Sequence, residues 1–158
     1  MRIESTKDTK LIARLIMHPD LFGRITDDST SKWTRDDIIT HLNNKLDRTI
    51  FLLIKDNNGI VRGFFECEEQ EDGSFDMHPN MLRIGRGAFA VWAAKKVMRI
   101  IFNATKTHML RGRIPSKYLD VLKFTSLLGF KLDYMVEKEY VKDGIEYDMY
   151  YLTMSRSV

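Results

Sequence analysis

The chain has 158 residues, 44% of them hydrophobic, which suits a single domain with a full core spanning residues 1–158. It has no apolar run of about 18 residues, no charged-then-apolar leader and one cysteine, so we expect a cytoplasmic protein without membrane spans or internal disulfides. The net charge is +3, but residues 1–80 carry −4 and residues 81–158 carry +7. This asymmetry favours an anionic partner for the second half. Nucleic acid is disfavoured, because no reader motif accompanies the charge.

The first 55 residues predict two helices and a strand. Asp8 can cap a short helix that ends before Pro19. The segment Thr34–Asp37 has the pattern of a capping box and opens a second helix with apolar residues at helical spacing. Residues 49–55 are apolar on both faces, which is typical of a central strand.

A hairpin and a third strand follow. Asn58-Gly59 is a strong turn signal and leads into an alternating strand at 60–68. A polar turn ending at Gly73 then leads into a strand that starts at Ser74 and ends in His78-Pro79.

The second half begins with a basic, glycine-containing loop, residues 83–88, which opens an apolar helix. A strand follows at 109–113, and then a helix that stops at Gly129-Phe130. The turn Lys142-Asp-Gly144 joins two long strands, roughly 130–141 and 145–154. The order is therefore α-α-β-β-β-α-β-α-β-β, which predicts an α/β chain of the α+β type, with a mixed sheet and helices on its faces.

This order resembles the GNAT (GCN-five-related N-acetyltransferase) superfamily over nearly the whole chain. Three features carry the resemblance: the His78-Pro79 strand end, the Arg86-Gly87 loop before a helix, and the run from Phe124 to Phe130 before a terminal hairpin. The resemblance implies a mostly antiparallel sheet with helices on both faces. Its central parallel strands, near 74–82 and 108–113, should splay apart above a helix that begins at Arg86.

In finer detail the chain is similar to a phage-encoded branch of that superfamily. The shared segments are His18-Pro19-Asp20, Asp27-Asp28 and Ile114-Pro115. Some members of that branch are described as head-assembly proteins of short-tailed phages. This resemblance implies host cytoplasm as the location and phage structural proteins as partners.

The resemblance also implies a cofactor, acetyl-CoA or CoA. GNAT enzymes rest its pyrophosphate on backbone N–H groups at the start of the central helix, where unpaired donors and the helix dipole favour an anion. The residues at that position here are Arg83, Arg86, Gly87, Ala88 and Phe89. The alternative is a structural turn with solvated arginines. The family pattern Arg/Gln-x-x-Gly-x-Gly/Ala is broken, because neither Arg83 nor Arg86 as its first residue keeps the first glycine.

The usual general acid of the family is also missing. Its tyrosine falls at Thr125, and an aliphatic hydroxyl is a far poorer proton donor than a phenol. Tyr118, two turns earlier on the same helix, is a weak substitute and is better explained as a half-buried packing residue.

His78 is the tentative general base, because its intrinsic pKa suits proton transfer near neutral pH. The alternative for His78 is a strand-end residue bonded to backbone. Glu66 and Glu68 are other bases to consider, although a solvated acidic hairpin tip explains them better. Cys67 reads as a small buried strand residue, and the four histidines lack metal-ligand spacing, so no metal is expected.

Two functions remain open, and the first is favoured over the second. The first is a virion (head) assembly or accessory factor that keeps the scaffold with weakened or absent catalysis. The second is an active N-acyltransferase that uses acetyl-CoA on an unknown amine or protein acceptor. A homodimer through the C-terminal hairpin is a further expectation, because the hairpin is apolar and rich in tyrosine, at Tyr147, Met149, Tyr150 and Tyr151.

Overall fold

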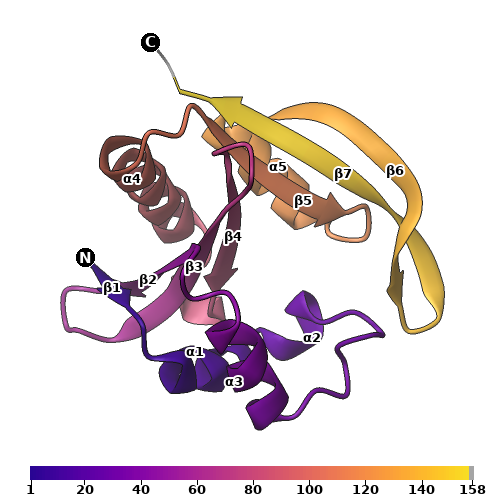
Figure 1. Cartoon of the computed structure of the whole chain (residues 1–158), viewed down its shortest axis with the longest axis horizontal. Coiled ribbons are helices and arrows are strands. Elements are labelled where there is room, and N and C mark those ends of the chain that lie inside the picture. The colour runs from indigo at the N-terminus through magenta and orange to yellow at the C-terminus, as the bar shows by residue number, and fades with distance from the viewer. Residues whose placement is uncertain (157–158) are drawn as a thin grey trace.

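The computed structural model describes residues 1–156, which are built on one seven-stranded sheet (Figure 1). Its strands are β1 (Arg2–Thr6), β2 (Thr49–Lys55), β3 (Val61–Glu69), β4 (Phe75–Met81), β5 (Met109–Pro115), β6 (Lys131–Lys142) and β7 (Ile145–Ser155). Their order across the sheet is β1-β2-β3-β4-β5-β7-β6. Only β4 and β5 run parallel, so the predicted mixed, mostly antiparallel sheet is confirmed.

Helices cover both faces of the sheet. They are α1 (Thr9–Ile16), α2 (Phe22–Ile25), α3 (Arg35–Asn43), α4 (Ala88–Ala104) and α5 (Leu119–Leu128), with a 3-10 turn, η1 (Arg83–Gly85), before α4. Phe51 and Leu53 of β2 pack with α1 and α3, whereas Leu52 and Ile54 pack in the core with α4 and α5. Because both of its faces are covered, β2 is apolar throughout.

The helix-capping signals are confirmed. The Asp8 carboxylate accepts a hydrogen bond from the Leu11 N–H at 2.9 Å and caps α1. Thr34 and Asp37 form the complete capping box of α3. Gly129 ends α5 with φ of 95°, the left-handed conformation that glycine adopts without strain.

Two elements were not predicted, and two boundaries are wrong. The strand expected to end at His78-Pro79 continues to Met81, because β4 stays paired with β3 up to that residue. The strand β1 is mostly polar, and β2 supplies its register, so its own sequence carries little signal. The helix α2 has four residues and no side-chain cap. The central helix begins at Ala88 and not at Arg86, because the chain first makes η1 and then turns at Gly87, whose φ is 76°.

The parallel strands β4 and β5 separate soon after they meet (Figure 1). They pair only at Phe75 with Leu110 and at Asp76 with Arg111. Beyond these positions β4 continues to Met81 and β5 to Pro115 without further pairing. The predicted splay is therefore confirmed, and it lies in the middle of the sheet.

None of the helices within residues 1–156 has the length and apolar character needed to cross a membrane.

Candidate functional site

The N-terminus of α4 follows the C-terminal end of β4 and offers free backbone donors. Within residues 1–156, the N–H groups of Ala88, Phe89 and Ala90 have no acceptor, and the first bond of the helix runs from Val91 to the Gly87 carbonyl. Gly87 is exposed, and a Cβ built on it would meet nothing within 4 Å. Unpaired donors and the helix dipole give this end a partial positive charge of about half a unit, so the residues fit the phosphates of a CoA-type ligand.

Arg83 and Arg86, in the loop before α4, make different contacts. The Arg86 guanidinium donates to the Asp20 carbonyl at 2.8 Å and to the Met81 carbonyl at 3.3 Å, so it holds the loop in place. The backbone N–H of Arg83 donates to the Asp20 carboxylate at 2.7 Å. The Arg83 side chain is exposed and makes no hydrogen bond or ion pair with any described residue. Arg83 is therefore free to meet an anion, whereas Arg86 is largely committed to structure.

The two glycines of this loop also differ. A Cβ on Gly85 would lie 2.4 Å from the Arg62 carbonyl oxygen, so this glycine lets the loop pack against β3. Gly87 is instead required for its positive φ, because it turns the chain into α4. The broken family pattern thus leaves a single glycine facing open space at the helix start.

His78 lies on β4 at the start of the splay. It is partly buried and stands opposite Glu66 of β3 in the antiparallel register. Burial lowers its pKa; the Glu66 carboxylate opposes the shift and the Arg113 guanidinium adds to it. The neutral imidazole is therefore favoured at neutral pH, which a general base requires. The Asn80 side-chain amide donates to the His78 carbonyl at 3.1 Å, so the backbone of the residue is bonded as well.

Arg113 and Asp76 also belong to this candidate site, although no sequence motif marks either residue. One guanidinium nitrogen of Arg113 lies 3.4 Å from Asp76 Oδ2 across the splay. Asp76 is buried, with 10% of its side chain exposed. Finding this contact from sequence would have required the register of two parallel strands that are separated by the whole of α4.

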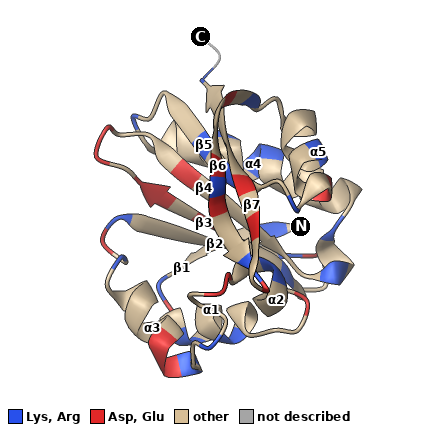
Figure 2. Ribbon diagram, turned by 90° about the vertical axis from the view of Figure 1, so that its right-hand side faces the viewer, with Lys and Arg blue, Asp and Glu red and all other residues tan. Residues whose placement is uncertain are grey.

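The two alternative bases are already engaged. Glu66 pairs with Lys45, and Glu68 pairs with Lys45 at 3.6 Å and with Arg48 at 3.0 Å. The side chains of Glu66 and Glu68 are 12% and 17% exposed, so the interpretation as a solvated hairpin tip is wrong for these two. Acidic and basic segments both occur on strands in the middle of the sheet (Figure 2). A carboxylate held by a buried ammonium is a weak base, which leaves His78 as the better candidate.

Neither residue considered as an acid has a hydroxyl that is free. Thr125 is buried, and its hydroxyl lies 3.0 Å from the carbonyl oxygens of both Val121 and Leu122. The hydroxyl of Tyr118 lies 3.4 Å from that of Tyr140, and the Arg24 guanidinium lies over the Tyr118 ring. Tyr118 is half-buried, which agrees with its interpretation as a packing residue.

The segment between α1 and α3 ties the two sides of the splay together. On the β4 side, Asp20 accepts hydrogen bonds from Arg83 and Arg86.

On the other side of the splay, the same segment contacts α5 and the C-terminal hairpin. Arg24 pairs with Asp120 at 2.6 Å, and the Thr26 carbonyl accepts from Tyr140 and Lys142. The Asp28 carboxylate accepts from the N–H groups of Asp143 and Gly144 at 2.7 and 2.8 Å. The motif residues Asp20 and Asp28 therefore fix the loop before α4 and the β6–β7 turn.

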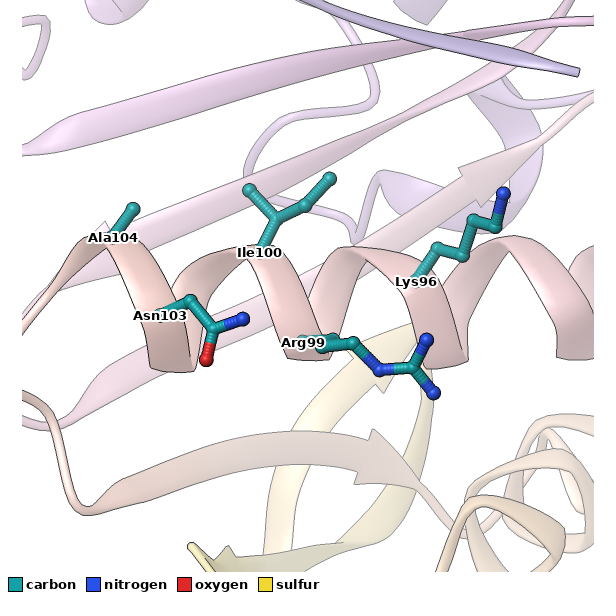
Figure 3. Close-up of a pocket in the computed structure, with 5 residues that line it drawn as sticks. All are labelled: Lys96, Arg99, Ile100, Asn103 and Ala104. Atoms are coloured by element: carbon teal, nitrogen blue, oxygen red, sulfur yellow. The ribbon is translucent and has the colours of Figure 1, made fainter.

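A shallow hollow on α4 lies outside this site (Figure 3). It is lined by five residues of that helix alone, Lys96, Arg99, Ile100, Asn103 and Ala104. At 1.5 Å per residue, Lys96 lies about 12 Å along the helix from its first residue. The hollow is a surface depression and does not adjoin the start of α4.

Two other chemistries find no support in the described part of the chain. Cys67 is fully buried, and burial raises its pKa to about 12, so it is no nucleophile at neutral pH. No group of three or more metal-ligating side chains is found among residues 1–156.

Solved structures share this architecture over its full length. A spermidine N-acetyltransferase from Vibrio cholerae, in complex with CoA and spermine, aligns with a TM-score of 0.83 and 12% identity over 98% of this chain and 94% of its own. A chimera of that enzyme aligns with a TM-score of 0.82 and 13% identity over 98% and 94%. A putative phosphinothricin N-acetyltransferase aligns with a TM-score of 0.80 and 16% identity, covering 99% of both chains. No protein-family model matches the sequence, and neither does any curated protein.

These neighbours show that the chain has the GNAT fold, as the resemblance implied. Identities of 12–16% carry the fold but do not carry an activity, because function depends on the side chains of the site. The phage-encoded branch has no counterpart among them.

Proposed function

We propose that the protein is an N-acyltransferase that uses acetyl-CoA. The main support is the splay of β4 and β5, which starts next to His78 and runs toward the uncapped N-terminus of α4. The neighbours with this fold are named as N-acetyltransferases, and one of them binds CoA. A base, a phosphate-binding helix end and an open strand pair are thus associated in one scaffold.

The cofactor would be held mainly by backbone. The N–H groups of Ala88 and Phe89 point out of the helix start, and Gly87 leaves room for a phosphate to approach them. The Arg83 guanidinium adds a mobile positive charge beside them. Arg86 contributes indirectly, because it fixes the loop through Asp20.

His78 would serve as the general base of the transfer. Its neutral imidazole takes a proton from the ammonium group of the acceptor, and the amine nitrogen then attacks the thioester carbonyl carbon. A C–N bond forms, the C–S bond breaks, and the products are an acetamide and the free thiol of CoA. The second proton on the attacking nitrogen is lost as the C–N bond forms and passes through water to the departing thiolate. An alkyl thiol has a pKa of about 8.5, so this transfer requires no dedicated acid. This accounts for the loss of the usual tyrosine at Thr125.

Cofactor binding is tested by thermal unfolding with and without acetyl-CoA. Ligand that binds only the native state stabilises by about 2.7 kcal/mol at a hundredfold excess over Kd, so we expect a rise of several degrees. Arg83→Ala should weaken binding several-fold without disturbing the loop. Arg99→Ala is the matched control, because this exposed cation lies in the surface hollow on α4. No shift for the unmodified protein, or equal affinity of all three, would refute the site.

Catalysis is tested separately with His78→Gln. We expect acetyl transfer to fall by at least a hundredfold while acetyl-CoA binding is retained. A variant with full activity would remove His78 from the mechanism.

The alternative function, a phage head-assembly factor with weakened catalysis, finds no support among the structural neighbours. It stays a prediction that rests on the resemblance of short segments. Deleting the gene and scoring virion yield would test it, and unchanged particles would rule it out.

A further inference from the structure

We infer that the acceptor amine carries a carboxylate, which Arg113 binds beside His78. The inference rests on the proposed function and names the class of its acceptor: an amino acid, or a peptide that presents both groups. The observation behind it is the position of Arg113 relative to His78 at the point where β4 and β5 separate.

The strand register places the two residues at the same level. Asp76 and Arg111 form the last pair between β4 and β5. Counting two residues further along each parallel strand gives His78 and Arg113, on the same face of the sheet. The Arg113 guanidinium also lies 3.4 Å from the Asp76 carboxylate, which is two residues before His78 on the same face of β4. A ligand at the opening of the splay would therefore meet both.

Arg113 keeps donors to spare. Its one ion pair is the 3.4 Å contact with Asp76, and 47% of its side chain is exposed. A guanidinium group carries five N–H donors in a planar fork that fits a carboxylate with two parallel hydrogen bonds. Asp76 thus orients the guanidinium group and leaves part of the fork open.

The carboxylates on this face, in contrast, are taken. Glu66 and Glu68 share Lys45, Asp76 pairs with Arg113, and Asp72 pairs with Arg111. A polyamine needs free carboxylates for its several ammonium groups, and each one here would first have to give up an internal cation. This face therefore offers Arg113 to an anionic group of a ligand. None of these four carboxylates is unpaired, so none is available to a polycation.

Pairs of acceptors that differ only in this group provide the test. Acetyl transfer would be measured at saturating acetyl-CoA for the common amino acids, for their carboxamides and for spermidine. We expect a free amino acid to exceed its carboxamide at least tenfold in kcat/KM. Arg113→Gln should abolish this preference, mainly through KM, and Arg113→Lys should reduce it. Arg111→Gln should keep the preference for the free amino acid. Arg111 lies on the same strand and the same face as Arg113, but before the point where β4 and β5 separate.

Equal rates for acid and amide, preference for spermidine, or an unchanged preference in Arg113→Gln would each overturn the inference. Binding of acetyl-CoA without transfer to any carboxylate-bearing amine would overturn it too and leave the cofactor site standing. Absence of acetyl-CoA binding would overturn the proposed function itself. Thermal unfolding of each variant shows whether a lost preference merely reflects a lost fold.

Discussion

At the scale of single residues, the proposed site contains His78, whose pKa is lowered by the fold. Burial dominates its titration, and the Glu66 carboxylate only partly offsets it. His41 on α3 is similar: burial lowers its pKa, and nearby Lys45 lowers it further. Lys45 and Glu66 contribute to the pKa shifts of both histidines, but burial is the larger cause in each.

Because the pKa values of His78 and His41 are lowered in the folded protein, we expect its stability to fall in mild acid. A group whose pKa is lower in the folded state takes up its proton more readily when unfolded. Stability is therefore full above about pH 6.5, the ordinary value, and falls as the pH drops toward the lower folded values. Urea unfolding measured at pH 7.5 and pH 5 would show this.

The variants His78→Gln and His41→Gln separate the two contributions. Each should reduce the difference in unfolding free energy between the two pH values, and the double variant should nearly remove it. A single variant with the pH dependence of the unmodified protein would show that its histidine is not held neutral.

At the scale of elements, short polar motifs fix the helices and turns that frame the site. The capping box of α3 is the clearest of them, because the Thr34 side chain accepts from the Asp37 N–H and the Asp37 carboxylate accepts from the Thr34 N–H. The helix it starts packs Ile38 and Leu42 against the sheet.

Thr34→Ala should therefore destabilise the protein by about 1 kcal/mol, the usual loss for a threonine cap. Thr34→Ser keeps the hydroxyl and should lie within a few tenths of a kcal/mol of the unmodified protein. Chemical denaturation distinguishes the two, and equal stability of both variants would mean that the cap is not formed.

The hairpin turn between β6 and β7 depends in a similar way on Asp28. Hydrogen bonds from Gly144 and Asp143 lower the pKa of its carboxyl, so the bonded form is the carboxylate. Asp28→Asn keeps one acceptor oxygen and loses the other. We expect faster amide hydrogen exchange at Asp143 or Gly144 and unchanged exchange in α3. Asp133→Asn on β6 is the control, because its carboxylate has no described partner.

At the scale of the whole molecule, the sheet has two edge strands, the short and mostly polar β1 and the long β6 of the C-terminal hairpin. The C-terminal hairpin was expected to pair across a dimer through tyrosines of its last strand, but β7 lies between β5 and β6. The hairpin strand at the edge is instead β6, which exposes apolar side chains: 60% of Leu132 and 41% of Met135 are accessible. Half of the residues of β6 are charged, but the stretch from Leu132 to Val136 is apolar apart from Asp133. An exposed apolar stretch on an edge strand is a template for pairing with another chain.

We therefore expect self-association through β6, measured by sedimentation velocity from low to high micromolar concentration. Leu132→Lys should shift the protein toward monomer. Ile60→Lys should not, because Ile60 is exposed to a similar degree but lies in the turn between β2 and β3. An unmodified protein that is monomeric throughout this range would contradict the expectation.

The sequence predicted most of the architecture because its signals are local. Capping residues, turn glycines and period-two alternation each act within a few positions, and the elements they predicted are present. The elements missed, β1 and α2, take their conformation from neighbours. The same distinction applies to the site: His78 could be singled out by its chemistry, whereas the Arg113–Asp76 contact depends on a register set by packing.

The short pairing of β4 with β5 has one more consequence, for aggregation. Past Asp76 and Arg111, each strand has an unpaired side that faces the interior of its own sheet. The edge strand β6 is open on its outer side. The unpaired sides of β4 and β5 instead face each other and are flanked by the segment from Asp20 to Asp28. We expect these backbone groups to bind an extended ligand that carries amide groups, such as the proposed cofactor, rather than another protein chain.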